Sequence, residues 1–255
     1  MRYKYLFFDG DDTLFDFKRC ERSAVQAVLR RHGLPAGGNA ADAYSRINDG
    51  YWKLLEQGRV RLEDLMTRRF ADLLALLEGH EGGRETAAAV EAVGGERLTA
   101  RPSSLRAAEL NRDYVEALGE RAYLLPGAEA LLRELFGTYH LILITNGLSA
   151  VQRSRLDRSP IRNYLEAAFI SSELGVAKPD PAYFDAVCQA LGIPVEQRRT
   201  ILVIGDSLTA DIQGAVRSGL DSCWFNPFNK ERTGAFTPTM TINRLDGLLR
   251  LLKER

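Results

Sequence analysis

The sequence predicts an α/β protein in which a doubly wound parallel sheet is combined with an inserted all-helical domain. Two observations support this prediction. Several short runs are apolar at consecutive positions rather than at alternate ones, which is typical of strands covered on both faces. One long interval lacks any strand pattern. The predicted strands are residues 3–8, 141–145, 167–171, 201–205 and 222–225.

Helical patterns alternate with the later strands, as expected for an α/β sheet. Pro126 and Pro181 begin two of these patterns, and Gly137 and Gly192 end them. Proline in the first turn and glycine after the last turn are typical helix start and stop signals. The predicted helices of this part are residues 126–137, 181–192, 210–219 and 244–255.

The interval 16–123 contains amphipathic helical patterns but no convincing strand, and it directly follows the first strand. We therefore expect a helical domain, 16–123, inserted into a core formed by residues 1–15 and 124–255. Residues 79–102 are rich in Gly and Ala and weakly patterned, which indicates a flexible connection with one short helix. The amphipathic stretches are 20–33, 43–58, 61–79 and 103–120.

The composition excludes several classes of protein. Lys and Arg number 34 and Asp and Glu number 34 among 255 residues, so the formal net charge is zero. Such a chain has no global attraction for a nucleic-acid polymer or an anionic membrane, and no stretch is apolar for the length of a membrane span. Cys20, Cys188 and Cys223 are far apart and lack metal-site spacing. We therefore expect reduced thiols in a cytoplasmic protein.

Carboxylates follow the first predicted strand directly, in the segment Asp9-Gly10-Asp11-Asp12-Thr13. Open α/β sheets bind ligands at the carboxyl ends of their strands. Carboxylates that lie close together repel one another unless a cation or a proton offsets their charge. The same residue types also form ordinary turns, so this segment alone leaves both interpretations open.

Asp206 and Asp211 follow the fourth predicted strand. With the first segment they would complete an all-oxygen site for a hard cation such as Mg²⁺. Either residue would also serve as a helix N-cap, which is the structural alternative.

The second and third predicted strands are followed by groups suited to an oxyanion. Thr145-Asn146-Gly147 offers a hydroxyl, an amide and backbone N–H groups, although these residues also form a good loop. Lys178 precedes two prolines that stiffen its backbone, and an isolated Lys-Pro would usually be structural. Together the four segments support a functional site better than any one of them does, since each follows a predicted parallel strand. All four are therefore expected at one edge of the sheet. The sequence has neither a P-loop nor a Gly-x-Ser-x-Gly elbow.

At these four segments the sequence resembles the haloacid dehalogenase-like (HAD) hydrolase superfamily. The family motifs are matched in order by Asp9-x-Asp11-x-Thr13, Thr145-Asn146, Lys178 and Gly205-Asp206-x-x-x-x-Asp211. The resemblance covers nearly the whole chain and implies a Rossmann-like core with a helical cap at 16–123. The segments FFDGDDTLFDF, ITNGLSAVQRSRL, ISSELGVAKPDP and CWFNP are similar to the pyrimidine 5′-nucleotidase branch. The Gly- and Ala-rich part at 82–102 departs from the compact cap of that branch.

The resemblance implies phosphate-monoester hydrolysis through a phospho-aspartyl intermediate. Asp9 would be the nucleophile and Asp11 the general acid and base. Mg²⁺ would be held by Asp9, the backbone carbonyl of Asp11 and Asp206. Asp211 would either bind the metal through water or orient Lys178.

The remaining polar groups would contact the substrate. Thr145 and Lys178 would contact the transferring phosphoryl oxygens, and Asn146 and Gly147 are further candidates for binding it. Phe17 at the start of the insertion is a candidate contact for a base. The same expectation applies to Trp52 and Arg69 of the cap, although Trp52 at helical spacing is also typical of a core residue.

The expected substrate is a small phosphorylated metabolite, namely a nucleoside 5′-monophosphate, acted on by a monomer or homodimer. The alternatives are a phosphatase for a sugar phosphate or phosphoglycolate, a phosphosugar mutase, a haloacid dehalogenase and a non-catalytic binding module on the same scaffold. A dehalogenase does not need an acid two residues after the nucleophile, so Asp11 together with Asp206 favours phosphate chemistry.

Overall fold

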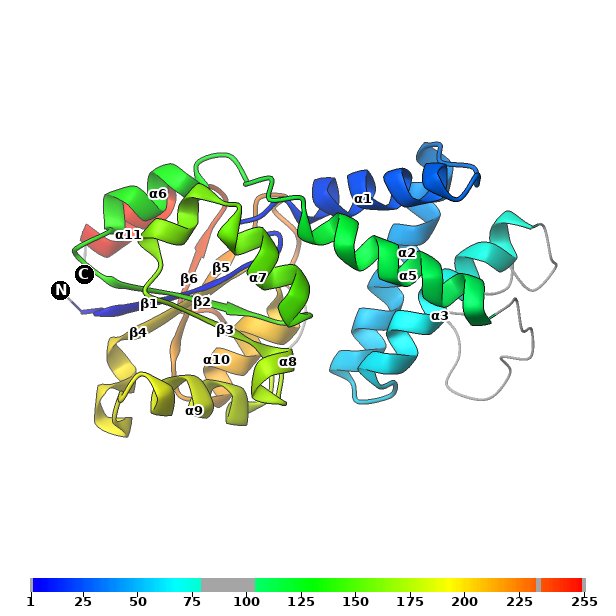
Figure 1. The fold of residues 1–255 in the computed structure, drawn as a ribbon. Coiled ribbons are helices and arrows are strands. Elements are labelled where there is room, and N and C mark those ends of the chain that lie inside the picture. Colours follow the sequence, from blue (N-terminus) through cyan, green and yellow to red (C-terminus); the bar gives the residue numbers. More distant parts are fainter. Residues whose placement is uncertain (1, 79–103, 233–234, 254–255) are drawn as a thin grey trace. The chain divides into compact units, whose positions relative to one another are not determined.

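The computed structural model describes residues 2–78, 104–232 and 235–253 (Figure 1). The chain divides into two compact units, one formed by Met1–Phe17 with Ala122–Arg255 and the other by Lys18–Arg121. The predicted insertion, 16–123, corresponds to the second unit, and its role as a cap stays a prediction. The Gly- and Ala-rich stretch expected to be a flexible connection lies outside the described residues.

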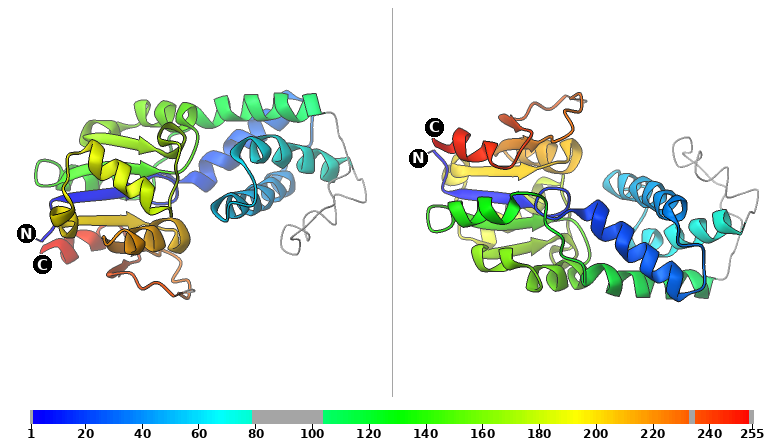
Figure 2. Two further views of the ribbon diagram at one scale, coloured as in Figure 1. Left: turned by 90° about the horizontal axis from the view of Figure 1, so that it is seen from below. Right: turned by 90° about the horizontal axis from the view of Figure 1, so that it is seen from above.

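A six-stranded sheet forms the centre of the first unit, and every pair of neighbouring strands is parallel. The five predicted strands are confirmed, whereas the sixth was missed because only three residues form it. In Figure 2 the arrowheads of the strands gather at one edge of the sheet. The strand order is β3-β2-β1-β4-β5-β6, so the chain builds the sheet outward from β1 in one direction and from β4 in the other. Doubly wound sheets bind ligands at this switch point between β1 and β4. The strands are β1 Tyr5–Asp9, β2 His140–Thr145, β3 Ala167–Ile170, β4 Ile201–Gly205, β5 Asp221–Phe225 and β6 Met240–Ile242.

Helices cover both faces of the sheet, which confirms the doubly wound architecture (Figure 1). Alternate strand residues point to opposite faces: Leu6 and Phe8 pack in one apolar core and Phe7 in the other. The first core includes residues of α6 (Ala128–Leu135), α7 (Ser149–Asp157) and α11 (Gly247–Lys253).

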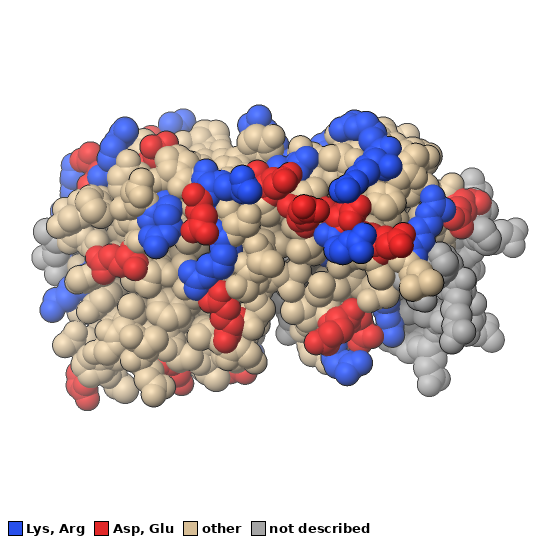
Figure 3. All heavy atoms as spheres, in the orientation of Figure 1, with Lys and Arg blue, Asp and Glu red and all other residues tan. Residues whose placement is uncertain are grey.

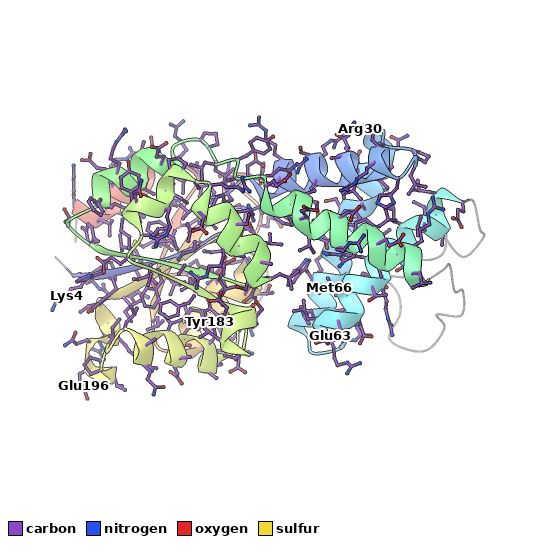
Figure 4. The ribbon with its side chains drawn as sticks, viewed as in Figure 1. Lys4, Arg30, Glu63, Met66, Tyr183 and Glu196 are labelled. Atoms are coloured by element: carbon purple, nitrogen blue, oxygen red, sulfur yellow. The ribbon has the colours of Figure 1, made fainter. Side chains whose placement is uncertain are left out.

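The second core includes residues of α9 (Pro181–Ala190) and α10 (Gln213–Arg217). Tyr183, labelled in Figure 4, projects from α9 toward the sheet. Its hydroxyl donates to the carbonyl of Phe169 at 2.8 Å, so α9 is tied to β3 by a polar contact as well as by packing. Short helical segments complete the unit: α8 Ser171–Leu174, η1 Pro160–Tyr164, η2 Val195–Thr200 and η3 Leu208–Ile212.

The second unit is helical throughout its described part, as predicted. Its interior contains an aromatic cluster in which Tyr44, Phe70 and Tyr114 lie with ring centroids 4.8–5.5 Å apart. Its helices are α1 Phe17–Arg31, α2 Gly38–Glu56, α3 Leu62–Leu77 and α5 Ser104–Gly119.

Charged side chains of both signs are interspersed on the face of each unit seen in Figure 3. This pattern agrees with the zero formal net charge of the chain. A negatively charged ligand would therefore have to be attracted by local groups. None of the described helices combines the length and apolar character that a membrane crossing requires.

Candidate active site

Lys178 joins the carboxylates of two predicted site residues. Its ammonium donates to Asp9 Oδ1 at 2.6 Å, to Asp211 Oδ1 at 2.7 Å and to the carbonyl oxygen of Ile144 at 3.0 Å. Asp9 ends β1 and lies opposite Ile144 in the β1–β2 pair, so the sheet register places two of these three acceptors. Lys178 is only 2% exposed, and its charge is therefore available only to groups inside the site.

The backbone of Lys178 is held by Asn146 through two hydrogen bonds. Asn146 Nδ2 donates to the carbonyl of Lys178 at 2.8 Å, and the N–H of Lys178 donates to Asn146 Oδ1 at 3.0 Å. Thr145 is fully buried at the end of β2. The N–H of Gly147 donates to Ser171 Oγ at 3.0 Å. Asn146, predicted to bind substrate, thus makes contacts that position the lysine.

Asp211 is held by both of its oxygens. Oδ1 accepts from Lys178, and Oδ2 accepts from the N–H of Ser207 at 3.1 Å. The preceding Gly205 leaves the room that Asp211 needs, because a Cβ there would lie 2.2 Å from Asp211 Oδ2. These contacts favour the expectation that Asp211 orients Lys178.

Asp9, Asp206 and Asp211 offer carboxylate oxygens that all lie within 4.8 Å of one another. Burial raises the pKa of Asp9 to about 7, although Lys178 acts in the opposite direction. Burial also raises the pKa of Asp206 well above its ordinary value, and the charges of Asp9, Asp211 and Asp12 add to this effect. Burial opposes the charged form of Lys178, but Asp211 and Asp9 raise its pKa.

The charges of this cluster do not balance. One lysine faces three carboxylates, so full ionisation would leave two negative charges among largely buried groups. Buried charges are stable only when they are paired or bind a cation. An all-oxygen donor set with that excess negative charge fits Mg²⁺, which prefers carboxylate and carbonyl ligands.

Asp11 lies in the loop after β1, and helix α7 holds its carboxylate. Gln152 Nε2 donates to Asp11 Oδ2 at 2.8 Å, and Arg155 Nη1 donates to Asp11 Oδ1. Neither partner was predicted from the sequence, because Gln and Arg on a helix are usually solvated. The sequence did contain one indication that these two residues act together: they are three positions apart and so lie on one face of α7.

Comparison of the chain with known protein families agrees with the geometry of this edge of the sheet. A family model described as a haloacid dehalogenase-like hydrolase matches residues 3–219. The chain belongs to the haloacid dehalogenase-like hydrolase family. Its matched region includes all four segments that the sequence placed at the carboxyl edge of the sheet.

Several relatives of this HAD-like hydrolase match over nearly the full length of both chains. The HAD-hydrolase YfnB of Bacillus subtilis is 32% identical over 98% of this chain and 96% of its own. Its magnesium-bound crystal structure superposes with a TM-score of 0.82 over 99% of each chain. The pyrimidine 5′-nucleotidase YjjG of Escherichia coli is 30% identical over 99% of each chain, and the pyrimidine 5′-nucleotidase PynA of Streptococcus pneumoniae is 33% identical over 100% of this chain and 97% of its own.

The three residues of the HAD-like hydrolase that were predicted to contact a base differ in burial: Phe17 and Trp52 are half-buried, whereas Arg69 is buried. Phe17 is half-buried at the start of α1, and the Arg155 guanidinium lies 6.0 Å from its ring centroid. Trp52 is half-buried in α2. Arg69 is only 4% exposed inside the helical unit, where Nη1 donates to Asn48 and Nη2 to Asn111. These contacts give Arg69 a structural role and leave it little surface for a ligand.

Proposed function

We propose that this HAD-like hydrolase cleaves phosphate monoesters through a phospho-aspartyl intermediate on Asp9, with Mg²⁺ as its metal. The single observation that carries the proposal is the contact of Lys178 with both Asp9 and Asp211 in a buried site. A cation fixed against a buried carboxylate favours the ionised form, which is the nucleophilic form. Lys178 would also offset charge on the phosphoryl oxygens, together with the hydroxyl of Thr145.

The metal would be held by Asp9, Asp206 and the backbone carbonyl of Asp11. Mg²⁺, when bound, would offset the negative charge that the carboxylates and a phosphate bring together. Asp211 is less suited to direct binding, because Lys178 and the N–H of Ser207 already occupy its oxygens. The proposed ligand set therefore uses Asp211 to orient the lysine.

The proposed reaction has two displacements at phosphorus. In the first, a carboxylate oxygen of Asp9 bonds to phosphorus, the bond to the ester oxygen breaks, and Asp11 gives its proton to the departing oxygen. In the second, a water oxygen bonds to phosphorus, Asp11 takes a proton from that water, and the bond to Asp9 breaks. The products are the alcohol, inorganic phosphate and the original carboxylate.

The proposed substrate is a nucleoside 5′-monophosphate, with a pyrimidine base favoured. Two full-length relatives that are 30–33% identical carry the name pyrimidine 5′-nucleotidase, which supports this choice. The helical unit Lys18–Arg121 would act as the cap that excludes bulk water, and Trp52 remains its candidate contact for the base. Phe17 is a second candidate contact for the base.

The test is phosphate release from a panel of pyrimidine and purine nucleoside 5′-monophosphates, sugar phosphates and phosphoglycolate, with and without Mg²⁺. We expect the highest kcat/KM for a pyrimidine nucleotide, and no turnover by Asp9→Asn on any member. Preference for a sugar phosphate would contradict the proposed substrate, and an isomeric sugar phosphate as product would indicate a mutase. Absence of turnover on the whole panel and on p-nitrophenyl phosphate would contradict the hydrolase itself.

A further inference from the structure

Both carboxylate oxygens of Asp11 are occupied by side chains of one helix, α7. Gln152 Nε2 donates to Oδ2 at 2.8 Å, and Arg155 Nη1 donates to Oδ1. One donor on each oxygen restricts rotation of the Asp11 carboxyl group more than two donors on the same oxygen would. The Asp11 side chain is 24% exposed, so it keeps access to a ligand while α7 holds it.

Arg155 is itself held rigidly. Its side chain is fully buried, and its guanidinium lies 4.4 Å from the ring centroid of Phe15. A planar guanidinium that stacks on a ring and pairs with a carboxylate is fixed in both orientation and distance. Arg155 therefore holds Asp11 from a side chain whose own freedom has been removed by packing.

Gln152 is 3% exposed, and the nitrogen and oxygen of its amide differ in their contacts. Nε2 donates to Asp11, whereas Oε1 is buried and, within the described part of the chain, has no hydrogen-bond partner. An unpaired buried acceptor is destabilising, so stability alone would favour an apolar side chain at this position. The chain nevertheless places an amide here with its donor on Asp11.

The backbone of Gly147 is adapted to the same contact. This glycine has a φ of +152°, and a Cβ on it would lie 3.0 Å from Gln152 Nε2. Gly147, in the loop after β2, thus leaves room for the amide that reaches Asp11. The Asp11 carboxylate is thus surrounded by three elements: its own loop after β1, the loop after β2 and helix α7.

We infer that Gln152 and Arg155 are positioning residues that orient Asp11 for proton transfer to the departing oxygen. The inference rests on the proposed function, in which Asp11 is the acid. Neither side chain is assigned a contact with substrate. Both act through Asp11, by fixing the direction in which its carboxyl group faces.

The predicted consequence is a loss that depends on the leaving group. A nucleoside is a poor leaving group and needs a proton as the bond to phosphorus breaks, whereas p-nitrophenolate departs readily without one. The value of kcat/KM reports the first displacement, before water attacks. A misplaced acid should therefore lower kcat/KM for the nucleotide far more than for the aryl phosphate.

The experiment compares kcat and KM for uridine 5′-monophosphate and p-nitrophenyl phosphate in Gln152→Leu, Arg155→Met and Arg155→Lys. We expect kcat/KM for the nucleotide to fall about 10-fold in Gln152→Leu and about 10²-fold in Arg155→Met, mostly through kcat. For p-nitrophenyl phosphate we expect a loss below about 3-fold. Arg155→Lys, which retains a donor of the same charge, should recover part of the nucleotide activity.

Two further variants calibrate these results. Arg158→Met removes an exposed arginine from the end of the same helix and should leave both substrates unaffected. Asp11→Asn sets the largest leaving-group effect that the site can show. Because Arg155 is fully buried, its variants are compared with the wild type only if their unfolding midpoints match. If they do not fold, Gln152→Leu decides the outcome.

Equal losses on both substrates in folded Gln152→Leu, or no loss on either, would overturn the inference while Asp11→Asn still shows the leaving-group effect. If Asp11→Asn itself shows no such effect, Asp11 is not the acid. The acid assigned to the proposed reaction and the inference that depends on it are then both overturned.

Discussion

The ammonium nitrogen of Lys178 lies 2.6 Å from Oδ1 of Asp9, and the two residues are 169 positions apart in the sequence. Both are buried at the carboxyl edge of the sheet. The lysine also reaches Asp211, so its single charge is shared between two carboxylates while a third, Asp206, lies nearby. The local excess of negative charge determines how the site should respond to a metal and to substitution.

Mg²⁺ should stabilise the protein, and Asp206→Asn should abolish most of that effect. A cation that binds only the folded state adds about 2.7 kcal/mol at 100 times its Kd. Without metal, Asp206→Asn should be more stable than the wild type, because it removes repulsion with Asp9 and Asp211. The measurement is the Tm with Mg²⁺ and with EDTA, with the exposed Asp157→Asn as control. A full Mg²⁺-dependent shift in Asp206→Asn would contradict the proposed ligand set.

Gly205→Ala should damage the site although it adds only one methyl group. The new Cβ would lie 2.2 Å from Asp211 Oδ2, so one of the two must shift, and a shift of Asp211 would disturb its contact with Lys178. We expect a stability loss of about 1–3 kcal/mol and a fall in kcat of about 10²-fold. Gly37→Ala is the control, because a Cβ there meets nothing within 4 Å. Unchanged turnover in Gly205→Ala would show that the position of Asp211 does not matter.

Stability of the helical unit should depend on the ionisation of Glu21. Burial raises the pKa of Glu21 from 4.5 to about 6, against the attraction of Lys18 and Arg69. Asp49 adds repulsion, and Asn48 Nδ2 donates to Glu21 Oε1 at 2.8 Å. Because the folded state binds the proton more tightly, stability falls as the pH rises from about 4.5 through 6. A shift of this size corresponds to about 2 kcal/mol.

Glu21→Gln should remove this part of the pH dependence, since the amide oxygen can still accept from Asn48 without carrying a charge. The measurement is the urea midpoint between pH 4.5 and 8 for the wild type and the variant. Glu63→Gln on α3, an exposed position labelled in Figure 4, is the control. If the Glu21→Gln and wild-type curves remain parallel over this range, Glu21 does not titrate as described.

Arg69→Met should reduce stability and leave substrate affinity largely intact. The substitution removes the donors to Asn48 and Asn111 and the guanidinium that lies 4.8 Å from the ring centroid of Tyr114. Leaving buried acceptors without a partner costs about 1–3 kcal/mol each. Urea unfolding and KM for uridine 5′-monophosphate test this together. A raised KM at unchanged stability would instead support the predicted contact of Arg69 with substrate.

Much of the core could be predicted from the sequence because continuous apolar strands and capped helices are local signals. The placement of Asp9, Asp206 and Lys178 at one edge followed from a general property of parallel sheets. Strand β6 was missed because Met240–Ile242 alternates over only three residues, with Thr241 exposed. A pattern that short does not stand out from a loop.

The contacts of individual side chains could not be predicted because they depend on tertiary packing. Gln152 and Arg155 have the polar character of a solvated helix face, yet the position of α7 against the first loop buries them on Asp11. Arg69 belongs to an amphipathic helix, and only the packing of α2, α3 and α5 encloses it. Asn146 was predicted only as a substrate contact, and its two hydrogen bonds to the backbone of Lys178 could not be read from the sequence.

In the proposed reaction, Asp9 carries the phosphoryl group during turnover. The direct measurement is acid quenching of the enzyme during steady-state hydrolysis of uridine 5′-monophosphate with Mg²⁺, followed by peptide mass spectrometry. We predict one added phosphoryl group on the peptide that contains Asp9, and none in Asp9→Asn. A phosphoryl group on another residue, or full turnover by Asp9→Asn, would contradict it.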